Sequence, residues 1–203
     1  NDAAMNLDDI GYAPTILDPK VLITNGCARY PYLVGAEIIN ALEIQAGASL
    51  RTSSRDLTVN GLATLSGALI AAGSETITFN SNVVFSSATF TPAQSTVKIN
   101  GSVAQSFTPA GNTFYVLNLA NTNAITVTDA FTTRDLTFPA STASVTFASG
   151  FTATNVTLSV SGGASLNFAA GQTYTVRNSL ILRGTGAASV TLSSSAASAW
   201  YLN

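Results

Sequence analysis

Short apolar segments recur along this chain at a nearly constant interval. All but the last have the order apolar–polar–apolar, and their starts are separated by 20, 20, 20, 19, 20 and 20 residues. The segments begin at Leu57, Ile77, Val97, Leu117, Leu136, Val156 and Val176. Alternation with a period of two is the pattern of a β-strand, whose successive side chains point to opposite faces. We therefore predict that the outer two residues of each segment face a core and the middle residue faces solvent.

A second series of apolar residues lies between the members of the first. Its spacing is looser, as expected where turns absorb insertions, and it contains Leu50, Leu69, Phe90, Phe107, Val127, Val145, Leu166 and Val190. Asn, Gly, Ser and Pro, which suit tight turns, separate the segments. Each repeat therefore holds at least two short strands.

Asn60, Asn80 and Asn100 occupy the same place in three successive repeats. In a stack of coils these residues would form a column, and their amides could bond to one another as an Asn ladder. We interpret the column as structural rather than as a ligand site.

A repeat of this length and regularity favours a solenoid, in which each coil stacks on its neighbour. A β-sandwich, the alternative, also spaces its strands by about 8–12 residues. However, a sandwich gives no reason for one motif to recur at multiples of 20. We predict an all-β parallel β-solenoid, or β-helix, of about eight coils of ~20 residues each.

The first 41 residues do not follow the repeat, and they hold three of the six prolines. We therefore divide the chain into a non-repeat segment at 1–41 and a solenoid domain at 42–203. An uncovered solenoid end exposes unpaired backbone groups. The segment is predicted either to cap that end or to join subunits by adding a strand to a neighbour.

Aromatic residues gather at both ends of the chain, where the repeat stops. Three tyrosines lie in the non-repeat segment, and the single Trp lies in the last four residues. We predict subunit contacts at Tyr12, Tyr30, Tyr32, Trp200, Tyr201 and Leu202.

Charge is scarce and unevenly distributed. Only 9% of the 203 residues are charged, against roughly 25% in an average chain, and the net charge is −2. Residues 1–43 hold six acids and two bases, whereas residues 44–203 hold four acids and six bases. With no basic patch, nucleic-acid binding is not expected. No apolar run approaches 18 residues, so no membrane-spanning helix is expected either.

Side chains suited to catalysis or metal binding are almost missing from the sequence. There is no His, the commonest general base, and the single Cys27 cannot form an internal disulfide or a Cys-based metal site. The one compact group of charges, Asp129, Arg134 and Asp135, is interpreted as a solvated corner. We expect no enzyme activity, no cofactor and no metal.

Two stretches, TVKINGSVAQSFTPAGNTFYVLNLANTNAITVTDAFTTRDLTF at 96–138 and GASLNFAAGQTYTVRNSLIL at 163–182, are rich in Ser, Thr and Asn. They resemble the repeats of prokaryotic secreted β-solenoid surface proteins, such as autotransporter-like passenger domains and filamentous-haemagglutinin-like adhesins. The resemblance is one of style and period, covers about residues 42–198 and does not reach residues 1–40. It implies an extracellular, structural or adhesive role.

These observations predict an extracellular structural protein at the cell surface. It would be a subunit of a self-assembling fibre or biofilm matrix, or part of an adhesin stalk, joined head to tail through its ends. Such a heterologous contact does not close and so propagates as a filament. One alternative is a carbohydrate-binding adhesin that stacks glycans on exposed Tyr and Trp. A polysaccharide-active enzyme is a further alternative, less favoured because acids are few.

Overall fold

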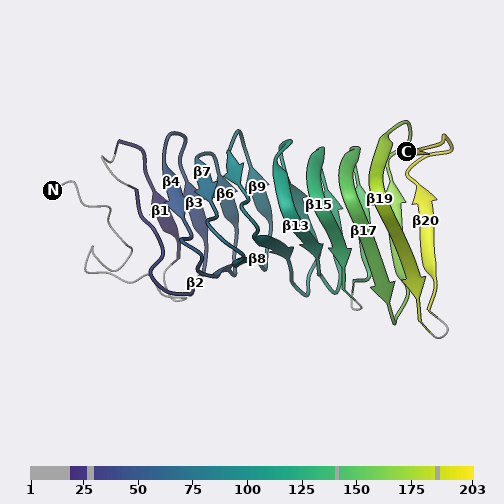
Figure 1. Cartoon of the computed structure of the whole chain (residues 1–203), viewed down its shortest axis with the longest axis horizontal. Coiled ribbons are helices and arrows are strands. Elements are labelled where there is room, and N and C mark those ends of the chain that lie inside the picture. Colours follow the sequence, from purple (N-terminus) through teal and green to yellow (C-terminus); the bar gives the residue numbers. More distant parts are fainter. Residues whose placement is uncertain (1–18, 27–29, 140–141, 186–187) are drawn as a thin grey trace.

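The chain forms a rod of stacked coils (Figure 1). The computed structural model describes residues 19–26, 30–139, 142–185 and 188–203. These residues contain 21 β-strands and no helix. Every pairing between the strands is parallel. The fold is therefore the predicted parallel β-solenoid of about eight coils, not a sandwich.

Two long sheets and one short sheet run along the rod. The first long sheet contains, in spatial order, β1 (Val21–Ile23), β3 (Leu42–Ile44), β6 (Ala63–Leu65), β9 (Val83–Phe85), β12 (Gln105–Thr108), β14 (Ala124–Val127), β16 (Ser144–Phe147), β18 (Ala164–Phe168) and β20 (Val190–Ser194). The second long sheet contains β2 (Glu37–Ile39), β5 (Leu57–Val59), β8 (Thr76–Phe79), β11 (Thr96–Ile99), β13 (Thr113–Leu119), β15 (Phe131–Phe138), β17 (Phe151–Val160), β19 (Thr173–Gly184) and β21 (Tyr201–Leu202). The short sheet contains β4 (Ser49–Arg51), β7 (Ala68–Ile70) and β10 (Phe90–Thr91).

The cross-section of the rod changes along its length. Near the N-terminal end each coil contributes one short strand to each of the three sheets. From β13 onward, one longer strand in each coil replaces the separate strands of the short sheet and the second long sheet. The start of β13 lies beside β10, where the Asn112 side chain accepts a hydrogen bond from the Phe90 backbone N–H (2.9 Å). Coils with three sides therefore continue into flatter coils with two.

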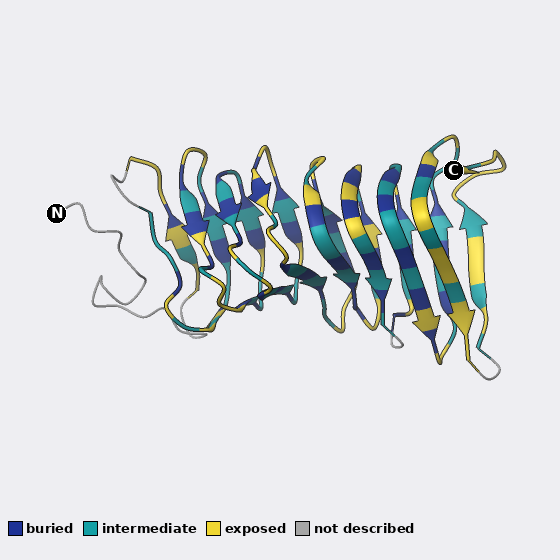
Figure 2. Ribbon diagram, viewed as in Figure 1, coloured by how far each residue is buried: buried dark blue, intermediate teal, exposed yellow. Residues whose placement is uncertain are grey.

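The predicted inward residues do form the core. The columns that begin at Leu57 and Val59 in β5 stay buried through β17, and the residues between them are only partly buried. Figure 2 shows this alternation along the strands. Parallel pairing in register places each apolar residue on its counterpart one coil away.

A file of aromatic rings runs inside the C-terminal half of the rod. Ring centroids of neighbouring members are 4.3–6.5 Å apart, mostly edge to face or tilted, which is the favourable geometry for aromatic pairs. The file comprises Phe85, Phe90, Phe107, Phe114, Phe131, Phe138, Phe147, Phe151, Phe168, Tyr174 and Trp200.

The predicted Asn ladder is confirmed. The Asn80 amide donates to Asn60 Oδ1 (2.7 Å), and the Asn100 amide donates to Asn80 Oδ1 (2.8 Å). A second ladder lies further along, where Asn155 donates to Asp135 Oδ1 (2.7 Å) and accepts from Asn178 (2.8 Å). Both ladders tie the corners of successive coils together.

The second apolar series combined two different sheets. Leu50, Leu69 and Phe90 lie in the short sheet, whereas its later members, from Phe107 to Val190, lie in the first long sheet. The sequence analysis did not predict the early strands β3, β6 and β9 of the first long sheet. They are three residues long, and only a few residues separate them from the preceding strand, so the two apolar segments merge in the sequence.

The segment at 1–41 contributes to the solenoid where it is described. β1 pairs with β3 and β2 pairs with β5, so residues 21–23 and 37–39 supply strands of the first coil. Residues 1–18 lie outside the described residues. The role of the segment as a cap or as a joining element stays a prediction.

Glu75 is a buried carboxylate at the corner between β7 and β8, where it accepts several hydrogen bonds. Burial raises the pKa of the carboxyl, but bonds from the Thr52 hydroxyl and from backbone N–H groups, including those of Ala72 and Gly73 (2.8 Å each), outweigh it. The pKa therefore lies below its ordinary value of 4.5. The ionised group stabilises the fold above that value, and its contribution is lost as the pH falls through the lowered pKa.

We expect Glu75→Gln to lower the free energy of unfolding by about 1–3 kcal/mol at neutral pH, because hydrogen bonds to the charged group are lost. The deficit should shrink as the pH falls below 4.5 and through the lowered pKa of Glu75, because the wild-type side chain then becomes uncharged like that of Gln. Thermal or urea unfolding across this range measures both effects. Asp129→Asn, in a turn, is the control and should change little. A deficit that stays constant with pH would show that the charge of Glu75 is not the cause.

Candidate interface at the C-terminal end of the rod

A backbone irregularity in β19 changes which residues enter the last coil. Ala153 pairs with Val176 and Asn155 pairs with Ser179, so an additional residue is accommodated in β19. Val156 then pairs with Leu180 and Leu158 with Leu182. The predicted repeat at Val176 was therefore wrong in its phase, since the repeating position is taken by Leu180.

The core becomes exposed at this last coil. In the inward column of the second long sheet, Leu136 is 0% and Val156 3% exposed, but Leu180 is 41% exposed. In the first long sheet Leu166 is 2% exposed, and its neighbour Leu192 is 43% exposed. The column positions that are buried inside the rod are therefore exposed to solvent at its end (Figure 2).

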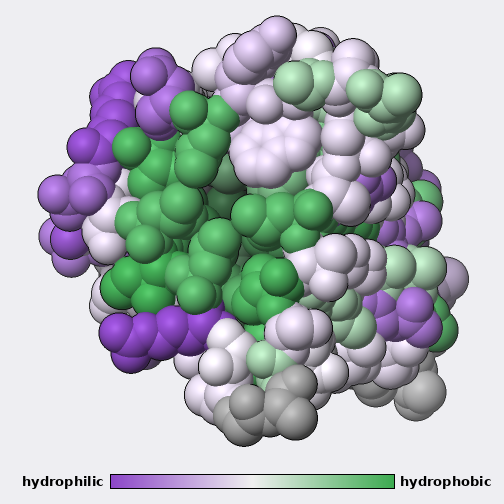
Figure 3. Space-filling view, turned by 90° about the vertical axis from the view of Figure 1, so that its right-hand side faces the viewer, coloured by the Kyte–Doolittle hydropathy of each residue, from purple (hydrophilic) through white to green (hydrophobic). Residues whose placement is uncertain are grey.

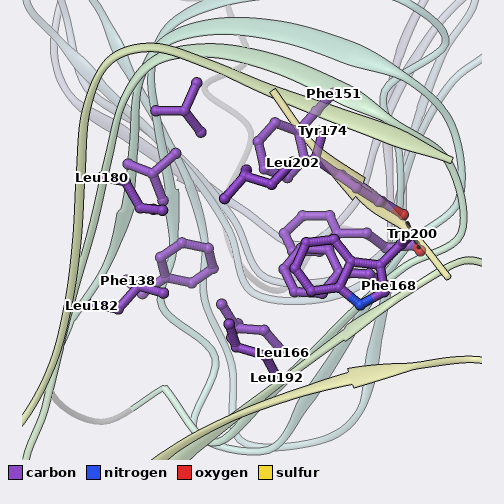
Figure 4. Close-up of a pocket in the computed structure, with 13 residues that line it drawn as sticks. Phe138, Phe151, Leu166, Phe168, Tyr174, Leu180, Leu182, Leu192, Trp200 and Leu202 are labelled. Atoms are coloured by element: carbon purple, nitrogen blue, oxygen red, sulfur yellow. Dashed lines mark hydrogen bonds between the residues drawn. The ribbon is translucent and has the colours of Figure 1, made fainter.

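These side chains surround an apolar hollow. Viewed onto this end, hydrophobic side chains form one continuous patch bordered by more polar ones (Figure 3). The close-up shows leucines and aromatic rings from different strands pointing toward one another (Figure 4). The hollow is lined by Phe138, Phe147, Phe151, Val156, Leu166, Phe168, Tyr174, Val176, Leu180, Leu182, Leu192, Trp200 and Leu202.

The end also carries unpaired strand edges. β21 pairs with β19 only at Thr173 and Tyr174, and the backbone of Asn203 continues this pairing to Val176. No described strand lies on the outer side of 179–184 or of β20.

Three of the predicted contact residues lie at this end, in different surroundings. Trp200 stacks on Phe168, with ring centroids 4.3 Å apart and planes at 26°, and so closes the aromatic file. Tyr201 and Leu202 are 58% and 50% exposed. The structure brings these residues together beside the hollow, and their role in subunit contact stays a prediction.

The predicted tyrosines at the other end are more dispersed. Tyr30 packs partly buried against the core, and Tyr32 forms a bridge to Arg51. Tyr12, like Cys27, lies outside the described residues. Their role in subunit contact likewise stays a prediction.

Sequence reasoning missed Leu180, Leu182 and Leu192. One signal was present, because residues 180–182 are Leu-Ile-Leu without the usual polar middle residue. A strand with both faces apolar is unusual at a solvated surface.

The end is also positively charged. Residues 161–203 contain Arg177 and Arg183 and no acid, and both arginines are exposed. At the opposite end of the chain, residues 1–43 have a net charge of −4. The two ends are therefore complementary in charge, although salt screens this attraction beyond about 8–10 Å.

The cluster of Asp129, Arg134 and Asp135 is divided between several structural contacts. Arg134 lies 3.5 Å from the Asp135 carboxylate, donates to the Tyr115 hydroxyl and covers the Tyr115 ring. Asp135 begins the second polar ladder. Within the described part of the chain, no group of three or more His, Cys, Asp or Glu could hold a metal ion.

No helix among the described residues is long and apolar enough to cross a membrane. Comparison of the chain with protein-family models, with curated proteins and with solved structures finds no match.

The exposed apolar end should bind a hydrophobic dye. We expect Leu180→Ser combined with Leu192→Ser to reduce ANS fluorescence at least two-fold, because ANS reports exposed apolar surface. The free energy of unfolding should also fall, by roughly 2–4 kcal/mol, because about three-fifths of each leucine side chain is already buried. Val103→Ser, which removes a 63% exposed apolar residue from a turn between β11 and β12, is the matched control. Equal ANS fluorescence in all three proteins would contradict an open apolar end.

Proposed function

We propose that the chain is an extracellular structural protein whose copies join head to tail into a surface fibre, a matrix or an adhesin stalk. The observation that carries the proposal is the C-terminal end, where core leucines and strand edges stay uncovered. The resemblance to secreted β-solenoid proteins supports the extracellular setting.

The parallel pairing of all the described strands makes end-to-end stacking geometrically simple. At the other end of the rod, β1 and β2 are the first strands of the two long sheets. A second copy moved along the rod axis presents these strands to the C-terminal end with the same polarity as an internal coil. The contact is heterologous, so each added copy leaves a free end and growth continues.

Burial of the exposed leucines alone gives only weak association. Full burial of a leucine is worth about 1.5–3 kcal/mol, so covering the remaining exposed surface of Leu180, Leu192 and Leu202 yields roughly 3 kcal/mol. Association costs an estimated 4–15 kcal/mol or more in lost freedom of motion. Backbone pairing and complementary charge must therefore supply much of the affinity.

We expect the purified chain to form linear assemblies whose length rises with concentration, seen by negative-stain microscopy and multi-angle light scattering. Leu180→Arg combined with Leu192→Arg should abolish them, because buried charges would face the partner. Val103→Arg, an exposed site in the middle of the rod, is the matched control and should still assemble.

Two outcomes would contradict this function. One is a wild-type chain that stays monomeric at every accessible concentration. The other is a monomer that binds glycans through exposed Tyr201, which would support the alternative of a carbohydrate-binding adhesin. Assembly of the double arginine variant would place the contact elsewhere on the rod.

A further inference from the structure

The two long sheets differ sharply in charge. In the first long sheet the strands from β6 to β20 contain no charged residue. In the second, the strands from β11 to β19 contain four bases and one acid, which are Lys98, Arg134, Arg177, Arg183 and Asp135. An anionic polymer that approaches the side of the rod is therefore attracted to the second long sheet.

A groove of about 340 Å³ lies beside this basic side of the rod, where β13, β15, β17 and β19 run side by side (Figure 1). Gly111, Ala130 and Gly150 line it and take equivalent places in successive coils, just before β13, β15 and β17. The surface is hollow there because none of these residues has a side chain larger than a methyl group. The groove is internal to the described rod, since Thr173 on its far side pairs with Tyr201 of β21.

A column of four threonines follows the groove along the strands. Thr113, Thr132, Thr152 and Thr175 pair in register and are exposed or half-buried. Two of them, Thr132 and Thr152, also line the groove. A hydroxyl group both donates and accepts hydrogen bonds, so this column can pair with the hydroxyl groups of a sugar.

Arg134 lies next to this column and is held in place without being used up. Its side chain is 53% exposed, and its guanidinium group lies 4.6 Å from the centre of the Tyr115 ring and 3.5 Å from the Asp135 carboxylate. A guanidinium group has five N–H donors, so these contacts leave donors for an external acceptor. Its planar fork matches a carboxylate with two parallel hydrogen bonds.

A second arginine repeats this arrangement two strands away. Arg177 is exposed and lies two residues beyond Thr175, just as Arg134 lies two residues beyond Thr132. Between them, β17 contributes the uncharged Thr154. Two strand spacings separate the arginine backbones by about 10 Å. A nucleic-acid strand carries a charge about every 3.4 Å, so a more sparsely charged polymer fits this spacing better.

We propose that this side of the rod binds an extended acidic polysaccharide, a polyuronate, which lies along the rod axis. Its sugar rings occupy the groove and contact the threonine column, and its carboxylates bind Arg134 and Arg177. The site does not depend on contact between copies of the chain. In a fibre each copy would present the same site, so attachment to one long polysaccharide would be multivalent.

The arginines are tested by the binding of a fluorescent galacturonate oligomer, followed by fluorescence anisotropy. We expect Arg134→Gln combined with Arg177→Gln to weaken binding about ten-fold, because charge-assisted hydrogen bonds are lost. Arg51→Gln combined with Arg55→Gln removes two exposed arginines near the N-terminal end of the rod and is the matched control. It should change the affinity less than about two-fold, since salt screens distant charges.

A second variant tests the groove without changing any charge. Ala130→Leu places a larger side chain in the groove, and Ala130 is exposed, so the fold should tolerate it. We expect galacturonate binding to weaken roughly five-fold or more, because a small ligand site depends on a preformed hollow. Thermal unfolding of each variant checks that the rod is intact.

The outcomes decide the site separately from the proposed function. Equal losses in the two double arginine variants, unchanged binding by Ala130→Leu or no binding by the wild type would overturn the site. So would equal binding of a neutral glucan, or tighter binding of single-stranded oligothymidylate, which would indicate a nucleic-acid ligand. Assembly without galacturonate binding would overturn only the site, whereas binding by a chain that never assembles would overturn only the fibre.

Discussion

Hydrogen bonding between successive coils is the constraint on which the rest of this rod depends. Parallel strands about 4.8 Å apart must stay in register, so each residue lies on its counterpart in the next coil. One apolar residue in a column therefore requires another, and a polar corner residue such as Asn80 can bond to Asn60 and Asn100. The 20-residue period follows from the length of one circuit around the core.

Where equivalent residues of successive coils recur at a constant spacing, the sequence predicts their position in the structure well. The inward columns that start at Leu57 and Val59 and the Asn ladder could all be predicted from spacing. The three-sided coils could not, because strands such as β6 and β7 are separated by only two residues and produce no distinct pattern. The change of phase at Leu180 depends on an irregularity in β19 that spacing alone does not reveal.

Exposure at the end of the rod is harder to predict, because it depends on whether a neighbouring strand covers the residue and not on the residue itself. Leu158 and Leu182 are consecutive members of one column and look alike in sequence. Leu158 is fully buried because β19 covers it, while the outer side of 182 is uncovered among the described residues. The candidate interface thus arises from the missing neighbour rather than from a motif.

Polar groups inside the rod are largely committed to its own backbone. The Gln105 amide donates to the Ser81 carbonyl (2.8 Å), and Asn121 donates to the Val103 carbonyl (2.7 Å). Such satisfied groups stabilise corners and offer little to a ligand. Coils in a solenoid contact only their neighbours, so an end coil lacks half of its stabilising contacts.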